Sequence, residues 1–180
     1  MNRLYSAVIL ALFVLHAGTA AASSSAQKTG DSITKFLPLA AFGTAYFKGD
    51  SEGKKQWLHD TLLHEVLYSG LVLGFNETSL GKRPNGGSYS FPSGHAGFAF
   101  AQAGFLQERY GWTYGAPALV LATAVSYIRV DIRKHHWRDV IAGSALGYSC
   151  AWLTVTPLNA THLAPTIGPG WMGIRYERSF

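Results

Sequence analysis

The sequence predicts a helical protein, because apolar residues recur at helical spacing along most of the chain and no convincing strand pattern interrupts them. Its 180 residues contain no internal repeat and fit one domain with one core better than two independent domains. We therefore expect an all-α fold, a compact bundle of about five helices with an active-site loop between helices two and three. The expected helices cover residues 33–47, 54–74, 93–110, 114–133 and 136–154.

The chain is expected to divide into four segments. Residues 1–22 have the pattern of a secretory signal peptide, with Arg3 before an apolar run and small alanines at the cleavage position. A retained membrane anchor is the alternative, and in both cases we expect export to the periplasm. A polar linker over 23–30 precedes the domain at 31–156, in which Asp31 is the expected N-cap of the first helix. The tail, 157–180, is rich in Pro and Gly, and its last part alternates as a short strand would.

The apolar runs of the expected helices bear on the question of a membrane. They are shorter than the roughly 20 residues needed to span a bilayer. Short helices of this kind could form the core of a soluble domain or enter one leaflet, and association with the membrane surface is the reading we favour. In the second helix we expect a buried apolar stripe made of Trp57, Leu58, Leu62, Val66 and Leu67.

Charge and cysteine content exclude two classes of function. The formal net charge is +5, and removal of residues 1–22 deletes only Arg3 and leaves about +4, a modest excess that suits an anionic substrate or membrane surface. The chain has no recognised nucleic-acid-binding motif and no long basic run, so we expect no nucleic acid partner. The single cysteine, Cys150, lies in an apolar stretch and is expected to be a core residue, which argues against redox chemistry.

Arg83 is the first candidate site residue. It lies between Lys82 and Pro84 in the expected loop over 76–92. A guanidinium offers donors in a planar fork that matches phosphate oxygens, and the proline stiffens the loop that aims it. Taken alone, this segment would be interpreted as a solvated basic turn.

The next candidates are Ser93, Gly94 and His95, directly before an apolar helical run. Ser93 is a natural N-cap, and the free N–H groups of a first helical turn favour an anion. His95 would lie beside that anion and, titrating near neutral pH, could protonate a departing oxygen. Taken alone, this segment could be an ordinary capped helix start.

A third group contains Arg129, His135 and Asp139. The aspartate follows the histidine by four residues, a spacing that puts both on one helical face and lets the carboxylate bind one ring nitrogen. That bond would fix the tautomer and leave the other nitrogen nucleophilic. A pair between His136 and Asp139, three residues apart, is a competing geometry.

Together these groups resemble the three signatures of the type 2 phosphatidic acid phosphatase (PAP2) superfamily, which is related to bacterial acid phosphatases and vanadium haloperoxidases. The resemblance covers about residues 76–150. The Pro-Ser-Gly-His signature is complete at residues 92–95, and the other two match at Arg83-Pro84 and at Arg129, His135 and Asp139. Two positions depart, since Asn76 stands where the family has its phosphate-binding lysine and Ile128 where it has serine.

The resemblance implies a phosphatase, a phosphoric monoester or anhydride hydrolase, that acts through a phosphohistidine intermediate. In such an enzyme His135 attacks phosphorus, His95 protonates the leaving group and Asp139 orients the nucleophile. Neither a metal ion nor another cofactor is implied. The substrate-binding residues would be Arg83, Ser93, Gly94, Arg129 and, in place of the missing lysine, Lys82.

Several alternatives stand beside this interpretation. A vanadium-dependent haloperoxidase would use the same pocket, although the small size of this chain argues against it. A non-catalytic relative that binds an anion or a lipid phosphate is motivated by Asn76. A serine hydrolase using Ser93 fits poorly, because Pro-Ser-Gly-His is not the nucleophile elbow of those enzymes. An exported, basic, apolar-rich domain favours a lipid phosphate over a small soluble ester, and the sequence does not predict the oligomeric state.

Overall fold

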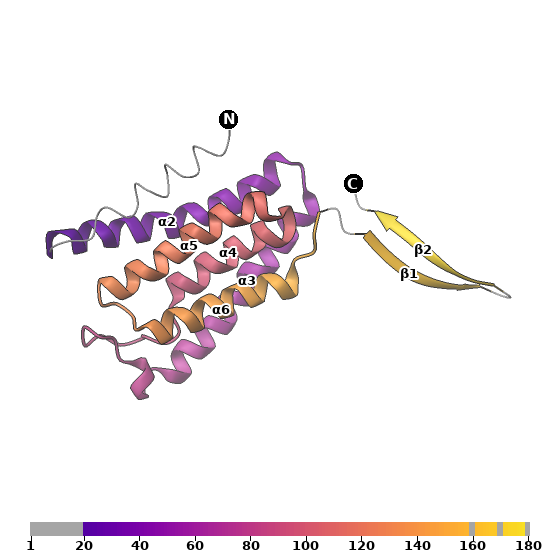
Figure 1. The fold of residues 1–180 in the computed structure, drawn as a ribbon. Helices are drawn as coiled ribbons and strands as arrows, with labels where there is room; N and C mark the ends of the chain where they lie inside the picture. Colours follow the sequence, from indigo (N-terminus) through magenta and orange to yellow (C-terminus); the bar gives the residue numbers. More distant parts are fainter. Residues whose placement is uncertain (1–19, 159–160, 169–170, 179–180) are drawn as a thin grey trace.

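The structure is a computed structural model that describes residues 20–158, 161–168 and 171–178 (Figure 1). This part of the chain contains five α-helices and one short 3-10 helix, η1. The expected all-α bundle is therefore confirmed, and four of the five helices agree with the expected bounds to within about three residues. The elements are α2 (Ala20–Phe47), α3 (Ser51–Phe75), η1 (Ser79–Gly81), α4 (Gly94–Tyr110), α5 (Trp112–Asp131) and α6 (Trp137–Thr154).

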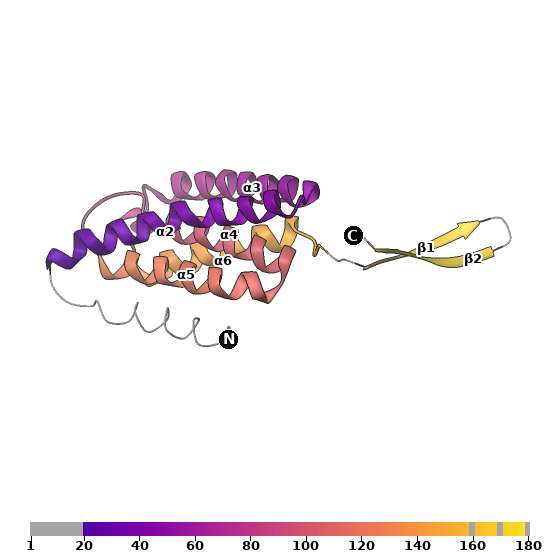
Figure 2. The ribbon, with the colours of Figure 1, turned by 90° about the horizontal axis from the view of Figure 1, so that it is seen from above.

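Helix α4 is the centre of the bundle and packs against the other four helices (Figure 2). Its buried face consists largely of small residues such as Ala99 and Ala103, which are fully buried. Close approach to α6 depends on glycine, because a methyl group at Gly147 would overlap the carbonyl of Gly97. The small side chains thus bring the start of α4 close to the start of α6, where the candidate site residues lie.

The first described helix is longer than the sequence predicts. The expected linker at 23–30 is wrong, because α2 begins at Ala20 and continues through Asp31, which is inside the helix and not its N-cap. The hydroxyls of Thr29 and Thr34 donate to carbonyl oxygens four residues earlier, so polar residues do not interrupt the helix. Gly30 packs against Ile128 of α5, which fixes this segment to the bundle. The expected signal peptide, 1–22, lies outside the described residues except for its last three.

Helix α3 buries its polar face and exposes its apolar one, so the expected buried stripe is wrong. Leu58, Leu62, Val66 and Leu67 are exposed, and Trp57 is only partly buried. The buried residues of the helix are instead mostly polar or small: Gly53, Gln56, Asp60, His64 and Val72. Periodicity identified the residues that share a face but could not say which face turns inward. No helix in the described ranges is both long and apolar enough to cross a membrane.

The tail forms an antiparallel hairpin of β1 (Thr161–Gly168) and β2 (Trp171–Arg178), paired from Thr161↔Arg178 to Gly168↔Trp171. A short strand was expected only near the end of the chain, and the Pro and Gly content of the preceding segment concealed its partner. The hairpin contacts none of the helices and extends away from the bundle (Figures 1 and 2).

A buried ion pair joins three chain segments at the end of the bundle opposite the start of α4. Asp50, the N-cap of α3, accepts hydrogen bonds from Arg109 Nε (2.7 Å) and Nη2 (2.6 Å) near the end of α4. Arg109 Nη1 also donates to the carbonyl of Thr156, after α6. Burial raises the pKa of Asp50, but hydrogen bonds from Arg109, Gly53 and Tyr110 outweigh it and hold that pKa below the ordinary 3.8.

Asp50→Ala should lower the free energy of unfolding by about 3–5 kcal/mol, because it leaves the Arg109 guanidinium buried without its partner. Chemical unfolding of the full chain followed by circular dichroism measures this. The stabilisation should be complete above the unfolded-state pKa of 3.8 and disappear as the pH falls through the lower folded-state value. The control is Glu52→Ala, which breaks an exposed pair with Lys55 and should cost about 0–1 kcal/mol. Equal losses in the two variants would contradict the assignment.

Candidate active site

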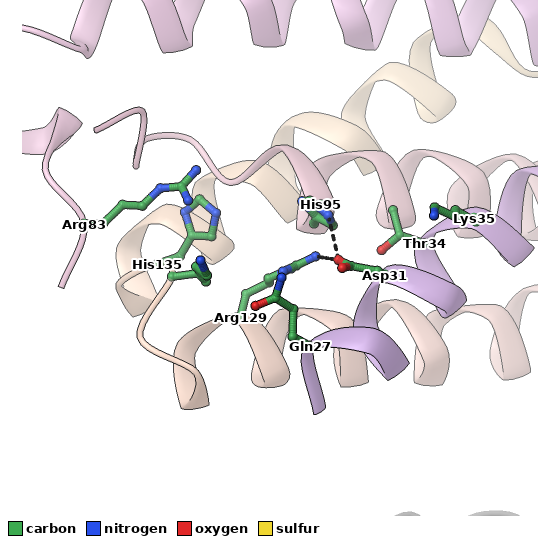
Figure 3. A pocket seen from close by; sticks show the side chains of 9 residues that line it. Gln27, Asp31, Thr34, Lys35, Arg83, His95, Arg129 and His135 are labelled. Atoms are coloured by element: carbon green, nitrogen blue, oxygen red, sulfur yellow. Dashed lines mark hydrogen bonds and ion pairs between the residues drawn. The ribbon is translucent and has the colours of Figure 1, made fainter. Parts of the chain in front are cut away.

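A cavity of about 480 Å³ opens at the end of the bundle where α4 begins and α5 ends (Figure 3). Four of the sequence-predicted site residues line it: Arg83, His95, Arg129 and His135. The other five lining residues come from the α2 helix and from the turn after α5: Gln27, Asp31, Thr34, Lys35 and Lys134. The lining therefore carries four cationic side chains and one carboxylate, a balance that favours an anion.

The start of α4 is held close to the start of α6. The Ser93 N–H donates to the carbonyl of Asp139 (2.9 Å), and the Ser93 carbonyl accepts from the N–H of Gly97 (2.9 Å). Ser93 is at the N-cap position, as expected, but its hydroxyl makes no cap hydrogen bond. A Cβ at Gly94 would lie 2.6 Å from Cζ of Tyr68, so a larger residue there would displace the tyrosine ring.

Three hydrogen-bonding groups of the site are buried without a partner among the described residues. They are the Ser93 hydroxyl, Arg83 Nε and Arg129 Nε. A buried polar group without a hydrogen bond costs about 1–3 kcal/mol, and guanidinium nitrogens can only donate. Phosphoryl oxygens would accept from all three, so these groups fit an oxyanion.

His135 is held by a backbone carbonyl. Its Nδ1 lies 2.8 Å from the carbonyl oxygen of Ser90, which can only accept, so Nδ1 carries the proton and Nε2 has a free lone pair. Burial, together with Arg83 and Arg129, lowers the pKa of His135 to about 4 against the opposing effects of Ser90 and Asp139. The imidazole is therefore neutral at physiological pH and available as a nucleophile.

The expected hydrogen bond between His135 and Asp139 is wrong. The two side chains are 3.9 Å apart, and His135 lies before the first residue of α6, so helical spacing does not apply to this pair. Asp139 Oδ2 instead accepts from the Ser90 hydroxyl (2.5 Å) and from the N–H of His136 (2.8 Å), closing a capping box. The carboxylate thus orients His135 through Ser90, while the competing pair with the His136 ring, at 3.3 Å, is the closer one.

Ser90 and Asp31 are among the site residues that the sequence did not reveal. Ser90 is fully buried in the loop before α4, and nothing in a Gly- and Ser-rich segment distinguishes it from its neighbours. Asp31 forms an ion pair with Arg129 of α5 and lies 3.2 Å from His95 Nε2 at the start of α4 (Figure 3). It precedes Arg129 by 98 residues, a separation that no local pattern can bridge.

His95 is the second histidine of the cavity. Burial, together with Arg129 and Arg83, lowers its pKa to about 4, although Asp31 acts in the opposite direction. Burial also raises the pKa of Asp31, but Arg129 and His95 outweigh it and hold that pKa below its ordinary value. The two histidines therefore differ in their partners, because His135 faces a neutral carbonyl and His95 a carboxylate.

The positions where this chain departs from the family signatures have structural roles of their own. The Asn76 side chain donates to Glu77 (2.7 Å) and accepts from the N–H of Tyr89 (3.0 Å), so it folds the loop. Ile128 packs against Gly30 of α2. Lys82 is exposed and does not line the cavity, whereas Lys134 does. Over the described ranges, no group of three or more potential ligands could hold a metal ion.

The geometry permits displacement at phosphorus, with a neutral imidazole as nucleophile, a second imidazole near a carboxylate, and arginines that would hold the phosphoryl oxygens. The remaining predicted residues, Gly94 and Asp139, act behind the cavity wall by allowing close packing and by positioning. Electrostatic stabilisation of this kind is usually the largest contribution to phosphoryl transfer.

Two curated relatives are similar to this chain over different lengths. The lipid A 4′-phosphatase of Helicobacter pylori is 31% identical over 135 residues, which are 71% of this chain and 68% of the relative. A lipid A 1-phosphatase of the same organism is 32% identical over 84 residues, 47% of this chain and 44% of the relative. The chain therefore spans about two thirds of the first relative and less than half of the second.

Two solved structures share the fold. The crystal structure of Aquifex aeolicus LpxE superposes with a TM-score of 0.63 at 24% identity, covering 81% of this chain and 93% of that one. A transmembrane PAP2 type phosphatidylglycerolphosphate phosphatase from Bacillus subtilis gives a TM-score of 0.59 at 21% identity, covering 86% and 85%. The family model of the PAP2 superfamily matches residues 39–161, most of the chain, and this chain therefore belongs to the PAP2 superfamily of phosphatases.

Proposed function

We propose that this chain is a lipid phosphatase that cleaves a phosphate monoester or pyrophosphate through a phosphohistidine on His135, without a metal ion. The observation that carries the proposal is the hydrogen bond from His135 Nδ1 to the Ser90 carbonyl, which leaves a neutral Nε2 beside buried, unpaired arginine donors. These are the groups that an attack on phosphorus requires.

The reaction has two balanced steps. In the first, the Nε2 lone pair of His135 forms a bond to phosphorus, the ester P–O bond breaks, and the departing oxygen takes a proton from His95. In the second, His95 accepts a proton from water, the water oxygen bonds to phosphorus, and the P–N bond breaks to release phosphate. Arg83, Arg129 and the Ser93 hydroxyl hold the phosphoryl oxygens in both steps.

Lipid phosphates are the substrate class that the relatives favour. The names of two curated relatives specify lipid A, and that of a structural neighbour specifies phosphatidylglycerol phosphate. The cavity itself is polar, with Gln27, Thr34 and Lys35 of α2 beside the two histidines, and suits a headgroup better than an acyl chain. The acyl chains would lie outside, along the apolar surface of the bundle.

The outer surface of the bundle supports work at a membrane. Side chains such as Leu39 (73% exposed) on α2, Val66 (69%) on α3 and Leu153 (67%) on α6 place apolar area on the outside of several helices. Contiguous exposed apolar surface marks contact with a membrane or a partner. We infer that this surface contacts lipid on the periplasmic side, to which the predicted signal directs the chain.

The proposed activity is tested by measuring phosphate release in the presence of a chelator. The substrates are lipid A, phosphatidylglycerol phosphate, phosphatidic acid and a soluble phosphate ester. The lipid substrates should be hydrolysed in chelator. His135→Ala should reduce turnover by about 10⁴-fold or more, as loss of a nucleophile does, whereas the neighbouring His136→Ala should retain most activity. Activity only on the soluble ester would refute the lipid assignment, a need for added metal would refute the metal-free mechanism, and equal losses in both variants would refute the nucleophile.

Lys134 should supply the cationic group that Asn76 does not. It lines the cavity directly before His135, and its backbone N–H donates to the carbonyl of Arg129 (3.0 Å). Lys134→Ala should lower kcat/KM by about 10²-fold, the effect of losing one transition-state donor. Lys82→Ala is the matched control and should change kcat/KM less than about twofold, because an exposed charge is screened by salt. A larger loss with Lys82→Ala would return that role to Lys82.

Membrane association should survive salt but not detergent. Because the proposed contact is apolar, the full chain expressed in a bacterial host should fractionate with the membrane and stay there in about 1 M salt, where charge attraction is screened to about 3 Å. Mild detergent should release it. Recovery in the soluble fraction, or release by salt alone, would contradict the proposed apolar contact.

A further inference from the structure

Asp31 is the one carboxylate among the nine residues that line the cavity, and it joins two groups from different helices (Figure 3). It pairs with Nη2 of Arg129, whose side chain is almost fully buried, and with Nε2 of His95 at 3.2 Å. Asp31 itself is held by α2, which packs on both α4 and α5. The contacts therefore connect the start of α4, the end of α5 and the middle of α2.

We propose that Asp31 is a positioning residue that orients His95 and favours its protonated form as the general acid, while it aligns Arg129 for the phosphoryl group. The inference rests on the proposed phosphatase function and adds a residue outside the three signatures. Asp31 supplies the carboxylate that opposes the effect of the surrounding cations on the charge of His95.

The groups around His95 otherwise oppose its charge. Arg129 from α5 and Arg83 from the loop face it, and the cavity wall adds Lys35, Lys134 and the imidazole of His135. From α3, Tyr68 packs against the adjacent Gly94, and in α6 the Asp139 carboxylate is engaged by Ser90 and His136. Asp31 is therefore the carboxylate that stabilises the imidazolium, in agreement with its upward effect on the pKa of His95.

The geometry also assigns the two ring nitrogens. Asp31 pairs with Nε2 at 3.2 Å, so we assign Nδ1 as the nitrogen that faces the leaving group. In the imidazolium both nitrogens carry protons. Nδ1–H can therefore donate its proton to the departing oxygen, while Nε2 keeps its own proton and stays paired with the Asp31 carboxylate. The neutral imidazole that results keeps its bond to Asp31, and Nδ1 can then accept the proton of the attacking water.

Asp31→Asn tests the proposal through its pH profile and its dependence on leaving group. The alkaline limb of kcat/KM should move to lower pH, because His95 loses its proton more readily without the carboxylate. With an alkyl phosphate, a poor leaving group, kcat should fall by about 10²-fold or more, the usual contribution of a general acid. An aryl phosphate, a good leaving group, should be affected much less. Asp31→Glu, which retains the charge, should recover part of the activity on the alkyl substrate.

The control is Asp131→Asn, which changes the net charge equally at an exposed position and should leave both substrates and the pH profile unchanged. Equal losses on both leaving groups without a shift of the pH limb would show a merely structural role. A gain in activity, or tighter binding of inorganic phosphate, would show instead that Asp31 occupies the anion position and competes with substrate. Either result would overturn the proposal.

A second readout does not depend on activity. Histidine NMR of the full chain in detergent, with the His95 signal assigned from His95→Ala, should show a lower pKa for that imidazole in Asp31→Asn than in the unaltered protein. An unchanged pKa would refute the pairing even if the enzyme is active. A lowered pKa in a protein that releases no phosphate would refute the proposed function while the pairing stands.

Discussion

The geometry of the site depends on the hydrogen bonds of Asp139. Its side-chain Oδ2 accepts from the Ser90 hydroxyl and from the N–H of His136, and its backbone carbonyl accepts from the N–H of Ser93. Ser90 in turn presents its carbonyl to His135. One fully buried residue thus fixes the loop before α4, the first turn of α6 and the proposed nucleophile relative to each other.

The placement of this contact in the bundle follows from small residues. Glycines and alanines where α4 meets α6 allow the backbones to approach, which brings Ser93 within hydrogen-bonding distance of Asp139. At the other end of the bundle, the ion pair of Asp50 and Arg109 joins the start of α3 to the end of α4. Because the site groups lie on helices and on the loops that join them, packing that is mostly outside the cavity fixes their positions.

Sequence patterns predicted the bundle and the group of residues that meet in the cavity, and they failed where the answer depends on packing. The spacing of His135 and Asp139 suggested a direct bond, but the helix begins only after His135. The apolar residues of α3 were expected to be buried, but they lie on the outer surface of the bundle. The side of α3 that faces the core carries Gln56 and Asp60 instead. Asp31 was interpreted as a helix cap, because no local sequence pattern indicates its partner Arg129, 98 residues away.

The electrostatic balance of the cavity has a chemical consequence. Burial and the two arginines keep His135 neutral, as a nucleophile must be, and the same surroundings oppose the charge that a general acid needs. The two imidazoles differ in their partners, because His135 contacts the Ser90 carbonyl and His95 contacts the Asp31 carboxylate. In the proposed mechanism, this difference between partners distinguishes the nucleophile from the general acid, although the two histidines are similarly buried.

Trapping the covalent intermediate tests the central claim most directly. The full chain would be mixed with an aryl phosphate, quenched in alkali within the first turnover, digested and analysed by mass spectrometry, since phosphohistidine survives alkali. We predict a phosphoryl group on the peptide that contains His135, located on that residue by fragmentation and missing from His135→Ala. Turnover with no labelled histidine, or a label on His95 or His136, would contradict the account.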